Sequence, residues 1–261
     1  MEQMHTATEQ QRNVDRSVLQ PRRLAEGTEA SPSLPKGTEE RFSGYGVMGL
    51  PFRSGHVLAL RRFAASSIGR GYTSVWHRAP SGEWTFYQDV PPEQSCARYF
   101  GPRLRRSVER PIEIRWTGAD RFSVDVDGGK AVQWDVTLAS PAAIRAMNVM
   151  ARMMPKALWR NEAALRAMGV MARRLLGTGR MVLAGLAPSG QHFIANPLVA
   201  WTIPSSRARI EGVDIGELGP LPEQEHLGDF WIPQRGLFVI GQAFFEPLDP
   251  TRHRCEVHAE S

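Results

Sequence analysis

A strict alternation of apolar and polar side chains over residues 112–140 constrains the fold more than any other feature. The alternation runs through three segments, and the sequence DGG at 127–129 separates the second from the third. The apolar members are Ile112, Ile114, Trp116, Phe122, Val124, Val126, Val132, Trp134, Val136 and Leu138. Because side chains alternate between the two faces of a strand, each segment has one apolar and one polar face. The stretch predicts a three-stranded antiparallel meander with one face in water.

The β pattern continues on both sides of this meander. Residues 56–63, 71–78 and 83–90 are typical of strands, and further strands are expected within 180–203, 207–218 and 235–248. The turn sequence APSG occurs at 79–82 and again at 187–190, each time between two strand-like segments. We therefore expect a mainly β fold, either an antiparallel β-barrel or a strongly curved sheet. Lipocalin-like barrels are an architectural analogy for it.

Two amphipathic helices interrupt the β pattern at about residues 141–176. Ser140 and Pro141 form a typical helix start, Asn161 is a typical N-cap, and Gly177 is a typical helix end. Apolar residues recur at helical spacing, namely Ile144, Met147, Ala151, Met154, Leu165, Met168, Met171, Ala172 and Leu175, with Met150 beside the first set. The charged residues of the pair are nearly all arginine. Three interpretations stay open: a cover for the sheet, a methionine-rich lid capping one end of a barrel, or a basic face on anionic lipid.

The rest of the chain divides into one domain and two polar ends. Residues 1–41 contain few large apolar side chains, which predicts a disordered tail. Residues 42–250 are expected to form a single β-rich domain that contains the helical insertion. Residues 251–261 are polar, and we expect them to be frayed.

The composition limits location and partners. The 261 residues have a formal net charge of +5, and Cys96 and Cys255 are the only cysteines. Two isolated cysteines fit a reducing compartment at least as well as one disulfide. The N-terminal region has no apolar segment typical of a signal peptide, and no apolar run reaches membrane-spanning length. We expect a cytoplasmic protein. Its oligomeric state does not follow from the sequence.

Several common sites are not indicated. The chain has no CxxC or HExxH spacing, and the GYGVMG at 44–49 does not follow a strand. We therefore expect no metal and no cofactor. The basic residues are not interleaved with aromatic residues as in single-strand binding platforms, so we expect no nucleic-acid partner.

The hairpin at 72–90 carries the candidate catalytic residues His77, Tyr87 and Asp89. A histidine near a tyrosine and a carboxylate can perform acid–base catalysis, because its pKa lies near neutrality. In the simplest register His77 faces Trp84 and lies on the opposite side from Tyr87. An odd-length loop would bring the two to one face.

Apolar and aromatic residues supply the candidate ligand-binding set. It consists of Trp76, Trp84, Met147, Met150, Met168, Met171, His192, Asn196, Trp201 and Trp231. The expected function is binding of an apolar or amphipathic small molecule, such as a lipid, polyketide or terpenoid, in a β-barrel cavity. A cofactor-independent lyase, cyclase or isomerase reaction is compatible with that set. The alternative is a peripheral membrane or protein-interaction module that uses the basic helices.

Overall fold

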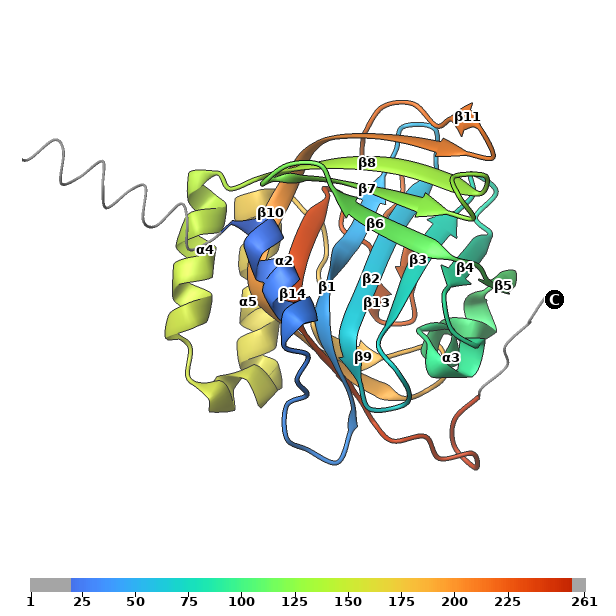
Figure 1. Ribbon diagram of the computed structural model, residues 1–261. Helices are drawn as coiled ribbons and strands as arrows, with labels where there is room; N and C mark the ends of the chain where they lie inside the picture. Colours follow the sequence, from blue (N-terminus) through green and yellow to red (C-terminus); the bar gives the residue numbers. More distant parts are fainter. Residues whose placement is uncertain (1–19, 255–261) are drawn as a thin grey trace, which may run out of the picture.

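The computed structural model describes residues 20–254 and is mainly β, as expected (Figure 1). The strands are β1 (Glu40–Pro51), β2 (Val57–Ser66), β3 (Tyr72–Arg78), β4 (Trp84–Gln88), β5 (Arg106–Glu109), β6 (Ile112–Trp116), β7 (Arg121–Val126), β8 (Val132–Ala139), β9 (Ala184–Leu186), β10 (His192–Ile210), β11 (Val213–Asp214), β12 (His226–Leu227), β13 (Phe230–Trp231) and β14 (Leu237–Phe245). The helices are α2 (Pro21–Ala30), α3 (Ala97–Phe100), α4 (Ala142–Met153) and α5 (Glu162–Leu176), with short 3-10 turns at Pro92–Gln94, Gly101–Arg103 and Lys156–Arg160. None of the described helices is long and apolar enough to cross a membrane.

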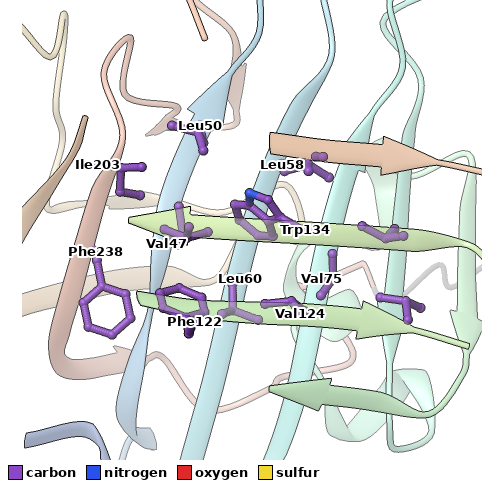
Figure 2. Close-up of a cluster of buried hydrophobic side chains, with 14 of the residues drawn as sticks. Val47, Leu50, Leu58, Leu60, Val75, Phe122, Val124, Trp134, Ile203 and Phe238 are labelled. Carbon is purple, nitrogen blue, oxygen red and sulfur yellow. The ribbon is translucent and has the colours of Figure 1, made fainter. Parts of the chain in front are cut away.

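Almost all of the described strands belong to one sheet that curls back on itself. Its order is β5-β4-β3-β2-β1-β14-β10-β8-β7-β6, and β9 and β11 also pair with β10. Strand β10 has 19 residues, and register shifts at Pro197/Val199 and Thr202/Ser205 bend it. One half of β10 therefore pairs with β14 and the other half with β8. The bend carries β6, β7 and β8 across β1, β2 and β3 (Figure 2).

The predicted meander is confirmed as β6–β8. Its register pairs Ile114 with Val124 and Val124 with Trp134, so the apolar face is continuous. That face packs on Val47, Leu60 and Val75 of the crossing strands (Figure 2). The interior of the curled sheet is therefore filled with side chains. The analogy with lipocalins, which hold a ligand inside the barrel, does not extend to this interior.

Both APSG copies form the same turn. Ala79 N–H donates to Glu83 O and Ala187 N–H donates to Gln191 O, each at 2.9 Å. The glycines at the end of the two copies, Gly82 and Gly190, have φ values of 94° and 90°. A left-handed backbone of this kind favours glycine over any residue with a Cβ.

The helical insertion is confirmed, and it packs on the outside of β10 and β14. Ile144 and Leu176 contact Leu237 and Val239, while Leu165 packs near Leu183 in a neighbouring cluster. The predicted apolar stripes are at least partly buried except at Leu175, which is 53% exposed. Met150, which lies beside the first stripe, is 46% exposed.

The expected polar tail is partly structured. Residues 21–30 form α2, whose Ala25 is fully buried in the same core cluster as the meander. Glu29 of this helix forms a two-point ion pair with Arg62 of β2, at 2.8 and 2.6 Å. The burial of Ala25 and the ion pair of Glu29 stabilise α2, although the segment itself has few large apolar side chains. Residues 1–19, Cys255 and most of the expected C-terminal end lie outside the described residues, although His253 is buried.

Candidate functional site

A cavity of about 90 Å³ lies on the outer face of the curled sheet, opposite the filled interior. Strands β1, β2, β3, β10 and β14 line one side, and α3, β13 and Met181 line the other. The lining is mostly apolar, and its aromatic members are Tyr45, Phe63, Tyr72, Trp76, Phe100, Phe193, Phe230 and Phe245. The polar members are Arg61, Tyr72, Cys96, Asn196 and Gln242.

Close strand approach shapes the floor of the cavity. A Cβ atom at Gly46 would lie 2.0 Å from the carbonyl oxygen of Leu60, and one at Gly241 would lie 2.2 Å from that of Asn196. Only glycine permits this approach. Gly46 and Gly241 have no side chain that could fill the space above the sheet, so a cavity remains there.

Arg61 is the charged group of the cavity. Strand alternation places Val57, Ala59, Arg61 and Phe63 on the cavity face of β2, and only 7% of Arg61 is exposed. Its Nη1 donates to the carbonyl oxygens of Val47 and Leu60 at 2.5 and 2.8 Å, and its Nη2 donates to Met48 O at 3.2 Å. A guanidinium has more N–H donors than these three contacts use.

The positive charge of Arg61 has no carboxylate partner within ion-pair distance among the described residues. The guanidinium carbon lies 4.5 Å from the ring centroid of Trp76 and 5.4 Å from that of Phe230. Burial lowers the pKa of Arg61 to about 10, so the group still carries its charge at neutral pH. Carbonyl dipoles and aromatic faces stabilise this charge only in part, because a buried ion is costly without a counter-ion.

Asn196 supplies an unpaired acceptor to the same cavity. It is buried on β10, and its Oδ1 atom has no hydrogen-bond partner among the described residues. Buried polar atoms without a partner are uncommon, and one that faces a cavity is available to a ligand donor.

Tyr72 and Cys96 form a hydrogen-bonded pair in the cavity wall. The Tyr72 hydroxyl lies 3.2 Å from the Cys96 sulfur. Burial raises the pKa of Cys96 to about 11 and raises that of Tyr72 well above its usual value. Both groups are therefore protonated at neutral pH. They can donate a proton or a hydrogen bond, but they cannot act as bases there.

Two members of the sequence-derived ligand set line this cavity, Trp76 and Asn196. Trp84 lies in the adjoining core, and Trp201 lies in the filled interior. Trp231 stacks on His226 outside the lining, and His192 contacts Glu162 at 3.4 Å.

The methionines of the helical pair do not line the cavity either. Met147 and Met168 pack between the helices and the sheet, Met171 is half-buried and Met150 is exposed. Among the described side chains of residues 142–176, none belongs to the lining. The only methionines in the lining are Met48 and Met181, which lie outside α4 and α5.

The catalytic candidates of the hairpin lie away from the cavity. The loop at 79–83 has an odd length, so His77 pairs with Thr85 rather than Trp84, and it shares a sheet face with Tyr87. That face is opposite the one that carries Trp76. Asp89 accepts a hydrogen bond from Thr73 N–H at 2.8 Å, which stabilises the end of the hairpin. The odd loop thus brings His77 and Tyr87 to one face, but none of the three residues lines the cavity around Arg61.

His77 has a different partner, His56. Nε2 of His77 lies 2.9 Å from Nδ1 of His56, and the two rings stack at 5.1 Å. Burial, and then the neighbouring His56 and Arg106, lower the pKa of His77 to about 4. Residues 20–254 contain no group of three or more ligating side chains that could hold a metal ion.

Arg61, Tyr72 and Cys96 are cavity residues that the sequence analysis does not single out. Arg61 has a sequence signal, because it shares the period-two face of Val57, Ala59 and Phe63. A charge within an otherwise apolar strand face indicates either a paired ion or a ligand site. Tyr72 and Cys96 have no such signal, since Tyr72 begins a strand of mixed composition and Cys96 follows the polar loop at 92–95.

Comparisons with known proteins add weak similarities to solved structures. No protein-family model matches the chain, and no curated protein matches it. It is similar to a solved structure of acetoacetate decarboxylase, with a TM-score of 0.39 and 14% identity over 86% of this chain and 91% of that one. Acetoacetate decarboxylase from Legionella pneumophila gives a TM-score of 0.35 and 12% identity over 82% and 86% of the two chains. Similarity this low carries no argument about activity.

Proposed function

We propose that the protein binds a small amphipathic carboxylate on the outer face of its curled sheet. The carboxylate pairs with Arg61, and the apolar part of the ligand occupies the aromatic cavity. A hydroxyl or amine on the ligand would satisfy Asn196. The observation that carries this proposal is the buried guanidinium in an apolar cavity, with no counter-ion among the residues that the structure describes.

The charge and geometry of Arg61 favour a carboxylate. A guanidinium presents its N–H groups as a planar fork that matches the two oxygens of a carboxylate. A single cation balances one negative charge, whereas a phosphate dianion would remain half-compensated in an apolar site. The limited cavity volume favours a short apolar chain or one ring.

Binding has more support than turnover. The ionisable side chains that line the cavity are one cation, Arg61, and three protonated acids, Tyr45, Tyr72 and Cys96, of which Tyr45 already shares a hydrogen bond with Glu29. None of them is a base at neutral pH. A cofactor-independent lyase, cyclase or isomerase reaction at this site would have to use the Tyr72–Cys96 pair as a proton donor.

Titration with hexanoate and with 1-hexanol tests the proposal. Trp76 in the cavity wall provides a fluorescence signal. We expect hexanoate to bind, and Arg61→Met to weaken it about tenfold or more, because a buried ion pair is lost. Binding of 1-hexanol should change little, since it carries no charge.

The matched control is Arg62→Met. Arg62 is the next residue on β2, but it faces the other side of the sheet and pairs with Glu29. This variant should retain hexanoate binding. Equal hexanoate affinity in the wild type and Arg61→Met would refute the role of Arg61. Absence of binding by both probes would refute the cavity as a ligand site.

A further inference from the structure

We propose that the outer face of α4 and α5 docks on an anionic lipid surface. The proposal is independent of the cavity, because the described side chains of these helices do not line it. The two helices lie against each other at one edge of the molecule, where α4 and α5 are labelled in Figure 1.

Exposed apolar side chains are concentrated on this face. Six of the eight large apolar residues that are exposed in the described part of the chain belong to the helical insertion: Val149, Met150, Met153, Leu158, Val170 and Leu175. Met153 is 77% exposed. Such a concentration within one short segment is typical of an interaction surface, whereas single exposed apolar residues are ordinary.

Arginine shares the face with these apolar side chains. On α4, Arg145, Val149 and Arg152 recur at helical spacing and are exposed. On α5, Arg166, Val170 and Arg173 do the same, with Arg174 beside them. The opposite side of each helix is buried against the sheet. The outer face is therefore both apolar and basic.

Few acids neutralise this charge. Glu162 is the only acidic residue between positions 142 and 176, and its nearest oxygen lies 4.0 Å from Arg166. Among the described residues, no carboxylate lies within ion-pair distance of Arg152, Arg173 or Arg174. These three guanidinium groups are available to an external anion.

The charge pattern favours a lipid surface over a second copy of the chain. Two copies joined through this face would place arginine against arginine, which opposes association. Apolar side chains set among arginines on surface helices suit the boundary between phosphate head groups and acyl chains. Arginine side chains can hold their charge at the phosphates while their stems remain in apolar contact.

Co-sedimentation with lipid vesicles tests this proposal. We expect the protein to sediment with phosphatidylcholine vesicles that contain phosphatidylserine, to stay in solution with phosphatidylcholine alone, and to be released by salt. The double substitution Arg173→Glu with Arg174→Glu should weaken binding about tenfold or more. Val170→Ser should also weaken it and leave its salt dependence unchanged.

The control is Arg207→Glu with Arg209→Glu, an equal charge change on exposed positions of β10. This variant should bind vesicles nearly as the wild type does. Equal loss in both double variants, or equal binding to neutral and anionic vesicles, would overturn the proposal. So would a dimer, detected by analytical ultracentrifugation, that the Arg173→Glu with Arg174→Glu variant abolishes. Thermal unfolding of each variant verifies that the fold is intact.

Discussion

Arg61 and Arg62 are neighbours on β2, and strand alternation directs their guanidinium groups to opposite faces of the sheet. Arg62 meets Glu29 of α2. Burial opposes ionisation of Glu29, but the hydrogen bond and charge of Arg62 outweigh it and lower the pKa of that carboxyl. Arg61 contacts carbonyl oxygens and aromatic rings, and no carboxylate of residues 20–254 lies within ion-pair distance of it. Arg62 therefore attaches α2 to the sheet, whereas the charge of Arg61 is left for a ligand.

The His56–His77 pair predicts a pH dependence of stability. The pKa of His77 falls from its usual 6.5 to about 4 in the folded protein. Between these values the unfolded chain binds a proton that the folded chain does not. The stability is therefore complete above pH 6.5 and decreases as the pH falls toward 4, by about 3 kcal/mol.

Urea unfolding of the wild type and His77→Gln at several pH values measures this effect. The variant should lose less free energy of unfolding than the wild type over the same interval, because its side chain does not titrate. The carboxylates contribute similarly to both proteins, so the difference isolates His77. If the free energies of unfolding of the wild type and His77→Gln fell equally with decreasing pH, His77 would not be the cause of the loss of stability in acid.

At the scale of elements, Asn148 attaches α4 to the sheet. Its Nδ2 donates to Ala200 O and its Oδ1 accepts from Ala200 N–H, both at 2.9 Å, and only 2% of the residue is exposed. The Asn148 side chain thus provides a hydrogen-bond partner for both the N–H and the carbonyl group of Ala200 on β10. Around it Ile144, Leu237 and Val239 form a small apolar cluster.

Asn148→Ala should destabilise the protein by about 1–3 kcal/mol, because it leaves buried backbone groups without partners. The neighbouring control Val149→Ala, at an exposed position, should change stability by less than about 0.5 kcal/mol. Hydrogen exchange should show faster opening of α4 in Asn148→Ala while the meander stays protected. Uniform acceleration across the sheet would mean that α4 and the sheet unfold as one unit.

At the scale of the whole molecule, the sheet has a filled face and a hollow one. The interior side is occupied by the cluster that includes Phe122, Val124 and Phe238 (Figure 2). The outer side retains the cavity around Arg61. A larger side chain should therefore lower stability on the filled face and block the cavity on the outer face.

Val124→Phe should destabilise by about 1–3 kcal/mol, because it overpacks the interior. Ala243→Leu places a similar side chain in the cavity wall, so it should leave stability nearly unchanged and abolish hexanoate binding. Denaturant midpoints and the fluorescence titration check the two expectations. A large stability loss in Ala243→Leu would indicate that the cavity is smaller in solution.

The meander, the helical insertion and the two APSG turns follow from the sequence because each depends on neighbours a few residues apart. A period of two sets the faces of residues 112–138, and the helix signals at Pro141, Asn161 and Gly177 need no distant partner. The helix α2 does not follow in this way. It is stabilised by the burial of Ala25 and by the contact of Glu29 with Arg62, which no local pattern reveals.

The position of the cavity is a property of the tertiary structure alone. Its lining comes from residues 44–48, 61–76, 96–100, 181–197 and 230–245, and the bends of β10 help to set how these segments meet. Sequence alternation shows that a strand such as β2 has two faces and that Arg61 lies on one of them. Which face becomes a filled core and which keeps space for a ligand depends on long-range pairing, because only that pairing determines what packs against each side.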